Sequence, residues 1–300
     1  MYVILGATGN TGAVVANKLL HEDKKVRVVG RDVKKLAPLQ KLGAEPIVGD
    51  LLEPGTLSDA FAGAEAVYWM MPPNMASKDY RAYQDQVTET TASAIESAKI
   101  KYVVTLSSIG ADKAEKTGPV AGLHAMEERF NRIPDTNILH LRPAYFMENF
   151  MPQISIIQNF GMMAGPLRGD LKLPMVATKD IGASAADALL ALDFRGKQTR
   201  ELLGQRDLSY GEAAKIIGSA IGRPALGYVQ LPPEQILQAM TGMGMSKNVA
   251  TLLVEMSDSL NNGYMVPLEP RTPANTTPTT FESFAQDSFA PAFRARAANA

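Results

Sequence analysis

The amino-acid sequence predicts an α/β fold in which a doubly wound parallel sheet is followed by a smaller C-terminal α/β region. Three observations favour this fold class. Short apolar runs alternate with segments of helical spacing through the first half of the chain. A glycine motif at residues 6–12 lies between the first such run and the first helical segment. The 300 residues, of which 46% are hydrophobic, suffice for one large core or for a main domain with a smaller satellite.

The alternation predicts six parallel strands. Strands that alternate with helices form right-handed βαβ units, whose helices cover both faces of the sheet. Six is the number of strands in a complete dinucleotide-binding fold of the Rossmann type. The expected strands are Tyr2–Leu5, Val26–Val29, Glu45–Val48, Ala66–Met70, Tyr102–Leu106 and Asn137–Leu141. The expected helices between them are Thr11–His21, Val33–Lys41, Thr56–Phe61, Arg81–Ala98 and Ala121–Arg132.

The pattern loosens after Pro143. Asp180 and Ser209 are expected to cap helices, because their side chains can accept hydrogen bonds from the first helical turn. The expected helices are Tyr145–Phe160, Ile181–Leu192, Tyr210–Ile221, Pro233–Thr241 and Val249–Asn261, with a loop at 161–166, strands at Glu201–Leu203 and Gly227–Leu231, and an amphipathic run at Phe281–Phe289. We expect a nucleotide-binding domain at 1–150. Residues 151–290 would form most of a substrate-binding region, with room for segments that return to the first domain, and 291–300 a disordered tail.

Composition excludes several classes of function. Without Cys there is no disulfide and no thiol nucleophile, and the three His are not spaced as metal ligands, so we expect no metal site. A net charge of −1 argues against nucleic acid and anionic membranes as partners. No apolar run approaches the ~20 residues that span a bilayer, and the first residues lack the pattern of a signal peptide. The expected location is the cytoplasm.

The glycine motif follows the first expected strand and opens the first expected helix, which is the context that dinucleotide binding requires. We expect Gly6 to allow a tight turn, Gly9 to let the backbone approach a pyrophosphate, and Gly12 to let the helix pack closely on the sheet. The phosphates would meet free N–H groups at the positive end of the helix dipole. An ordinary glycine-rich turn is the alternative. The expected cofactor contacts in this motif are Gly6, Thr8, Gly9, Asn10, Thr11 and Gly12.

The end of the second expected strand favours NADP(H) over NAD(H). NAD sites carry an Asp or Glu there, which accepts a hydrogen bond from the ribose 2′-hydroxyl, whereas this strand runs into Gly30, Arg31 and Asp32. A guanidinium can bind a 2′-phosphate through paired, charged hydrogen bonds, so we expect Arg31 to bind it and Lys35 to add a second cation. Asp32 is expected to cap the next helix. A solvated surface charge is the alternative for both cations.

Two further strand ends are expected to contact the cofactor, because ligands of open α/β sheets bind at the carboxyl ends of the strands. Asp50 and Leu51 follow the third strand and would lie near the adenine. A loop Asp without a ligand is the alternative reading of Asp50. Met71 and Pro72 follow the fourth strand and would pack along the ribose and the nicotinamide.

These segments resemble the NmrA-like branch of the atypical short-chain dehydrogenases/reductases. The resemblance extends over nearly the whole chain, and the run Arg142-Pro143-Ala144-Tyr145-Phe146-Met147-Glu148-Asn149 is its most specific part. The other matching segments are 6–12, 30–32, 49–51, 105–111, 180–182 and 278–285. The resemblance implies NADP(H) binding and one of two behaviours: reduction of quinones or dyes, or service as a redox sensor. In length and layout the chain is similar to the quinone reductase type.

One departure from the wider reductase pattern limits the chemistry. Those enzymes use a Ser and a Tyr-x-x-x-Lys pair for proton transfer. Ser107 or Ser108 stands at the position of the Ser, but no Tyr occurs between Tyr102 and Tyr145. His124 lies on the helix that would carry the Tyr, at a position where related atypical reductases hold His or Lys. The missing Tyr disfavours alcohol dehydrogenase and sugar epimerase chemistry.

Quinone reduction remains open because it demands less of the protein. Hydride would pass directly from NADPH, without flavin, to an electrophilic acceptor, and holding the two together supplies most of the acceleration. We expect His124 and Tyr145 as catalytic residues, with His124 orienting the acceptor or the ribose. Pro143, Tyr145 and Phe146 would border the nicotinamide, as would Ser107 and His124. For His124, a polar helix residue without a role is the alternative, and for the aromatic rings core packing.

The leading hypothesis is therefore an NADPH-dependent oxidoreductase that acts on quinones or similar acceptors. The rival is a non-catalytic NADP(H)-binding regulator that acts through a protein partner. Met147, Met151, Met162, Met163 and Met175 would line a permissive pocket for flat acceptors or would simply pack the core. A small-molecule acceptor is the expected partner, and a homodimer is left open.

Overall fold

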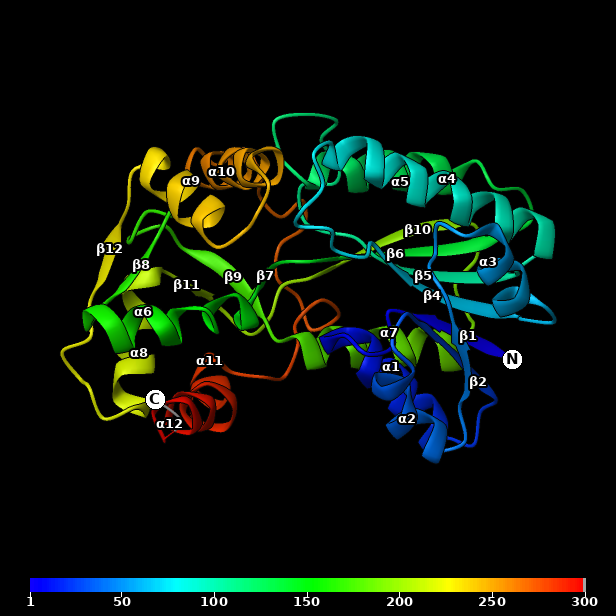
Figure 1. The fold of residues 1–300 in the computed structure, drawn as a ribbon, viewed down its shortest axis with the longest axis horizontal. Coiled ribbons are helices and arrows are strands. Elements are labelled where there is room, and N and C mark those ends of the chain that lie inside the picture. Colours follow the sequence, from blue (N-terminus) through cyan, green and yellow to red (C-terminus); the bar gives the residue numbers. More distant parts are fainter. Residues whose placement is uncertain (299–300) are drawn as a thin grey trace.

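Residues 1–298, which the computed structural model describes, contain a seven-stranded parallel sheet (Figure 1). The strand order is β10-β6-β5-β4-β1-β2-β3. The strands are β1 (Tyr2–Leu5), β2 (Val26–Gly30), β3 (Glu45–Val48), β4 (Ala66–Met70), β5 (Tyr102–Leu106), β6 (Asn137–Pro143) and β10 (Lys197–Leu202). The doubly wound fold is confirmed, but the count of six strands was wrong. The strand expected at 201–203 begins earlier and pairs along β6 as the seventh.

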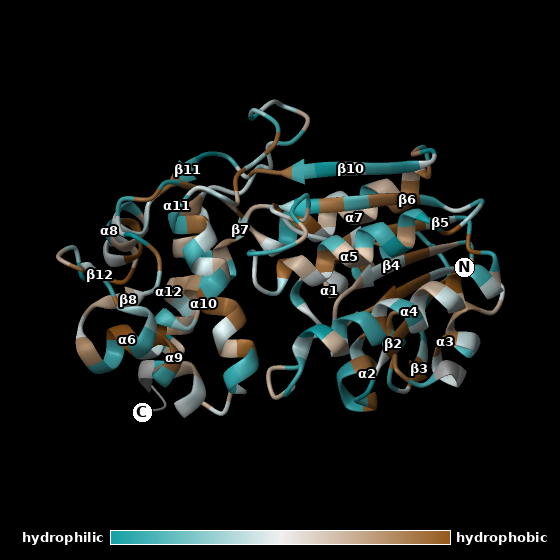
Figure 2. Cartoon of the chain, turned by 90° about the horizontal axis from the view of Figure 1, so that it is seen from above, coloured by the Kyte–Doolittle hydropathy of each residue, from teal (hydrophilic) through white to brown (hydrophobic). Residues whose placement is uncertain are grey.

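Helices cover both faces of this sheet. One face carries α1 (Asn10–His21), α2 (Val33–Lys41) and α7 (Thr178–Ala191), and the other carries α3 (Pro54–Phe61), α4 (Tyr80–Ala98) and α5 (Val120–Asn131) (Figure 1). These helices bury both faces of the sheet, and each face therefore has its own apolar cluster. The edge strand β10 is hydrophilic instead (Figure 2), which suits a strand whose outer side pairs with nothing in the described chain.

Helix α7 comes from the second half of the chain but packs on α1. A Cβ at Gly182 would come within 2.7 Å of the Thr11 carbonyl oxygen and of Val14 Cβ, so glycine permits this close approach. The expected cap of α7 was wrong. The helix begins at Thr178, whose N–H donates to both carboxylate oxygens of Glu148 at 3.0 Å. Asp180 lies in the first turn and accepts hydrogen bonds from the backbone and hydroxyl of Thr279.

A smaller lobe lies beside the Rossmann lobe (Figure 1). Its strands are β7 (Tyr145–Phe146), β8 (Met163–Gly165), β9 (Leu173–Val176), β11 (Asp207–Leu208) and β12 (Tyr228–Gln230), and its helices are α6 (Gln153–Phe160), α8 (Tyr210–Ala220), α11 (Phe281–Phe284) and α12 (Ala290–Ala298). A continuous helix over Tyr145–Phe160 was wrong. Tyr145 and Phe146 pair with β9, a 3-10 turn follows at Met147–Phe150, and α6 starts only after Pro152. The expected loop at 161–166 contains β8.

Two of the three cap predictions are confirmed. Asp32 accepts from the Lys34 N–H, and Ser209 forms a capping box with Glu212 at the start of α8. The disordered tail was wrong for 291–298, because the helix continues to Ala298 and Phe293 packs into the core of the smaller lobe. Residues 299–300 of that tail lie outside the described part.

Two more helices, α9 (Pro233–Gly242) and α10 (Lys247–Asn261), pack on each other, and α10 contacts both lobes. The loop after β4 binds the start of α10, since Ser246 donates to the Ser77 carbonyl at 2.5 Å and Asn248 accepts from the Tyr80 N–H at 2.8 Å. The loop before α5 also touches α10, because a Cβ at Gly118 would overlap the Leu252 carbonyl. In residues 1–298, no helix is long and apolar enough to cross a bilayer.

Candidate active site

The turn after β1 forms a cradle for an anion. Gly6 has a φ of +69°, a conformation that favours glycine, and its carbonyl accepts a 2.9 Å hydrogen bond from Gly9 N–H. A Cβ at Gly12 would lie 2.3 Å from the Gly6 carbonyl oxygen, so the tight turn and the close helix packing expected of these glycines are both present. The first turn of α1 holds no acidic residue, and its N-cap is Gly9, which has no side chain to occupy the free N–H groups. The cradle therefore fits a phosphate.

A groove, here named the glycine-loop pocket, extends from this cradle along the carboxyl ends of β1 to β4. Its lining residues are Gly6, Thr8, Gly9, Val29, Gly30, Arg31, Gly49, Asp50, Leu51, Met70, Pro72, Pro73 and Tyr83. The strand order reverses at β1, which is where open α/β sheets bind ligands. Arg31 is exposed and its guanidinium lies 4.0 Å from the Asp50 carboxylate.

Not every expected cofactor residue lines this pocket. Thr11 is buried and accepts a hydrogen bond from the Tyr68 hydroxyl at 2.8 Å, so its side chain faces the sheet. Met71 packs against the apolar cluster under α3 and α4, whereas Met70 faces the pocket. Asn10 and Gly12 lie just beyond the lining on α1, and Lys35 is exposed on α2.

Tyr83 of α4 is a lining residue that sequence reasoning missed. Its hydroxyl donates to the Pro72 carbonyl at 3.1 Å. Burial raises the pKa of Tyr83, the negative charge of Asp50 raises it further and the positive charge of Arg31 lowers it, so Tyr83 lies in the field of both. From the sequence alone, Tyr83 could be interpreted only as one residue on a face of an expected amphipathic helix.

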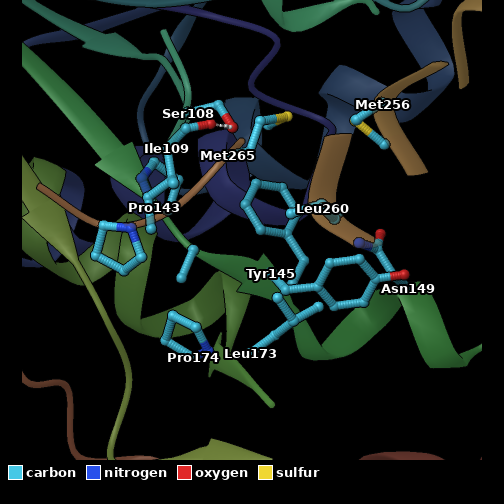
Figure 3. Close-up of a pocket in the computed structure, with 13 residues that line it drawn as sticks. Ser108, Ile109, Pro143, Tyr145, Asn149, Leu173, Pro174, Met256, Leu260 and Met265 are labelled. Carbon is cyan, nitrogen blue, oxygen red and sulfur yellow. Dashed lines mark hydrogen bonds between the residues drawn. The ribbon is translucent and has the colours of Figure 1, made fainter. Parts of the chain in front are cut away.

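A second groove, the apolar pocket, lies at the ends of β5 and β6 (Figure 3). It is lined by Ser108, Ile109, Pro143, Ala144, Tyr145, Phe146, Asn149, Leu173, Pro174, Met256, Leu260, Met265 and Pro267. None of these lining residues, all within the described chain, carries a charge. Pro143, Tyr145 and Phe146 were expected near the nicotinamide. Met256, Leu260 and Met265 were missed, because they approach from α10 and the segment after it, more than 100 residues along the chain.

Tyr145 places a polar group at one end of the apolar pocket, away from Ser108 (Figure 3). The hydroxyls of Tyr145 and Tyr210 are 2.5 Å apart. Burial raises the pKa of Tyr145, while hydrogen bonds from Tyr210 and Asn149 lower it. Tyr145 and Asn149 lie at the same end of the pocket (Figure 3). Burial therefore keeps this phenol protonated at neutral pH.

Ser107 faces away from both pockets. Its hydroxyl donates to Glu127 at 2.5 Å, and Glu127 in turn receives two hydrogen bonds from the guanidinium of Arg142. All three groups are largely buried. This network joins β5, α5 and β6 and so fixes the strand ends that carry Ser108 and Pro143.

The two histidines near the site differ. His124 lies on α5, where its Nδ1–H donates to the Ala111 carbonyl at 2.9 Å, and this leaves Nε2 as an acceptor in the neutral ring. His124 lines neither pocket. His140 is buried within β6 and hydrogen-bonded to Thr105 and Asn131, so it serves the structure of the sheet.

The fold and these two pockets define a dinucleotide-binding α/β protein of the short-chain reductase class. More specifically, the chain belongs to the NmrA-like family, whose model matches residues 2–285. It is 30% identical over 260 residues to an NAD(P)H azoreductase of Xenophilus azovorans, with 85% of this chain and 86% of that one covered.

Solved structures show the same fold. An NADPH-dependent quinone oxidoreductase from Escherichia coli, solved with NADPH, superposes with a TM-score of 0.80 at 19% identity and covers 96% of this chain and 100% of its own. A triphenylmethane reductase from Citrobacter sp. superposes with a TM-score of 0.76 at 18% identity, with coverage of 95% and 99%.

Proposed function

We propose that the protein is an NADPH-dependent oxidoreductase that transfers hydride to quinones or similar electrophilic aromatic acceptors. The observation that carries this proposal is that both pockets lie at the carboxyl ends of the strands of one sheet. An anion cradle with an exposed Arg lies at the ends of β1 to β4, and an uncharged pocket with one phenol lies at the ends of β5 and β6. The relatives that reduce azo compounds, quinones and triphenylmethane dyes support the same reaction class.

The glycine-loop pocket would hold the nucleotide. The N–H groups at the start of α1 would bind the pyrophosphate, and Arg31 would bind the 2′-phosphate in place of its contact with Asp50. Leu51 would pack against the adenine, and Pro72 along the ribose and the nicotinamide. His124 Nε2 is an acceptor suited to a ribose hydroxyl. When bound, NADPH supplies the hydride.

The apolar pocket would hold the acceptor. Ile109, Leu260 and Met265 exclude water and offer flat apolar walls, and methionine adapts to rings of different outline. Tyr145 would give the reduced acceptor its proton. In this division residues 1–150 hold the nucleotide, and the acceptor's walls come from both regions, with seven lining residues from 1–150 and six from 151–290.

Stopped-flow measurement of NADPH absorbance with a panel of uncharged quinones and azo compounds tests this proposal. We expect turnover well above the rate in solution and a large fall in kcat for Tyr145→Phe. If NADPH binds tightly but no acceptor is reduced faster than in buffer, the enzyme proposal fails, and a nucleotide-binding regulator takes its place.

A further inference from the structure

We propose that Tyr210 is a positioning residue for this reaction, whose buried hydroxyl donates to Tyr145 and leaves the Tyr145 hydrogen free to point at the acceptor. The inference rests on the proposed function, since Tyr145 is the proton donor there. Tyr210 itself does not line the apolar pocket. It would act on the reaction only through Tyr145.

Packing fixes Tyr210 in one place. It is the first residue of α8 and lies within the capping box that Ser209 and Glu212 form. Its ring lies 4.7 Å from the ring of Phe150 and 4.7 Å from that of Tyr228, measured between centroids. Only 4% of the residue is exposed. A side chain held this firmly keeps its hydroxyl at a constant position.

Tyr145 and Tyr210 each carry one hydroxyl hydrogen, and the acceptors available to these two hydrogens indicate which hydroxyl donates. Among the described residues the Tyr210 hydroxyl has a single hydrogen-bond partner, Tyr145. If Tyr145 donated, the hydrogen of the buried Tyr210 hydroxyl would have no acceptor, which is costly. If Tyr210 donates, its hydrogen is satisfied and the hydrogen of Tyr145 is left for the pocket. The neighbouring Tyr228 does not take this hydrogen: its hydroxyl donates to the Leu167 carbonyl at 2.7 Å, and among the described residues no hydrogen bond joins it to Tyr210.

The same contact helps the proton-transfer step. The acceptor takes up a hydride with its electron pair, and its oxygen or nitrogen then forms a bond to the Tyr145 hydrogen while the Tyr145 O–H bond breaks. The phenolate that results accepts hydrogen bonds from Tyr210 and from Asn149, and donors to an anion stabilise it. Water then returns a proton to Tyr145. Tyr210 keeps its own proton throughout.

The test compares phenylalanine variants, which remove a hydroxyl and keep the ring. We expect Tyr210→Phe to lower kcat by about tenfold, the lower end for a hydrogen bond to a charged group, with KM for the acceptor and the affinity for NADPH changed less than twofold. Tyr145→Phe should lower kcat by about a hundredfold, the lower end for general acid catalysis. The double variant should be no slower than Tyr145→Phe. The solvent isotope effect on kcat should grow in Tyr210→Phe and vanish in Tyr145→Phe.

Tyr228→Phe is the matched control, because it also removes a tyrosine hydroxyl from the same ring cluster. It should keep kcat within twofold of wild type, and circular dichroism should show all variants folded. A kcat of Tyr210→Phe equal to that of Tyr228→Phe, beside an impaired Tyr145→Phe, overturns this inference alone. A wild-type protein that reduces none of the acceptors overturns the proposed function and this inference with it.

Discussion

Glu127 and Arg142 form a buried, bidentate ion pair. Arg142 Nε lies 3.0 Å from one carboxylate oxygen of Glu127, and Nη2 lies 2.5 Å from the other. Their side chains are only 4% and 11% exposed. The pair links α5 to β6 next to Pro143, which lines the apolar pocket, so its loss should disturb that wall of the pocket.

Removal of one partner should therefore destabilise the fold. Arg142→Met leaves the Glu127 carboxylate buried with the Ser107 hydroxyl as its remaining donor, and a buried charge without its counter-ion costs about 3–5 kcal/mol. Urea unfolding followed by circular dichroism measures this. Arg81→Met is the control, since the Arg81–Asp85 pair is exposed and should be worth less than about 1 kcal/mol. Equal losses for the two variants would contradict the prediction.

His140 should make stability depend on pH. Burial lowers the pKa of His140 to about 4; the negative charge of Glu127 opposes this shift, and the positive charges of Arg142 and Lys197 add to it. In the unfolded chain a His titrates at about 6.5. Between these values the unfolded chain binds a proton that the folded one does not, so stability falls as the pH drops from about 6.5 to about 4.

The expected loss from His140 over that range is about 3 kcal/mol. His140→Gln should flatten the difference in unfolding free energy between pH 7 and pH 4.5, while His21→Gln, an exposed residue on α1, should leave it unchanged. An unaltered slope in His140→Gln would show that other groups cause the acid sensitivity.

Arg31 should select the phosphorylated nucleotide. Arg31→Ala should cost at least about 1.5 kcal/mol of NADPH affinity, the low end for a charged hydrogen bond, and little for NADH. Calorimetry with both nucleotides measures the difference. Lys35→Ala is a useful comparison because Lys35 is exposed and lies outside the glycine-loop pocket. Equal losses for NADPH and NADH in Arg31→Ala would argue against binding of the 2′-phosphate.

The acceptor pocket should discriminate by charge. Its lining residues within 1–298 are all uncharged, so a sulfonated acceptor would bury its charge without a partner. We expect kcat/KM for a sulfonated naphthoquinone to be at least about tenfold below that for its neutral parent. Leu260→Lys should reduce this difference in kcat/KM, because the lysine ammonium would pair with the sulfonate. If the wild-type enzyme showed equal kcat/KM values for the sulfonated and the neutral naphthoquinone, the acceptor would have to bind outside this pocket.

Local patterns predicted the first six strands, their helices and the glycine cradle, because an apolar run and a turn residue act on their immediate neighbours. The C-terminal lobe was predicted less well. Tyr145 and Phe146 become a strand only by pairing with β9, and Glu148 caps α7 from 30 residues away. Both relationships are tertiary and leave no local periodicity.

The candidate site was likewise predicted where neighbouring residues determine it, and was missed where tertiary contacts determine it. Gly6 and Arg31 lie at strand ends that the sequence marks, whereas Leu260 reaches the apolar pocket from α10. The role of Ser107 was inferred from motif position. Its hydrogen bond to Glu127 depends on how α5 packs, which the sequence pattern does not specify.

The contact between Gly182 of α7 and Thr11 of α1 has a consequence for biosynthesis. The helix whose N–H groups would bind phosphate is supported from behind by a segment translated about 170 residues later. A nascent chain that has emerged only as far as residue 150 also lacks β10, and therefore leaves β6 as a bare sheet edge. Nucleotide capture should thus begin only after α7 has left the ribosome, and until then the growing chain needs protection from aggregation.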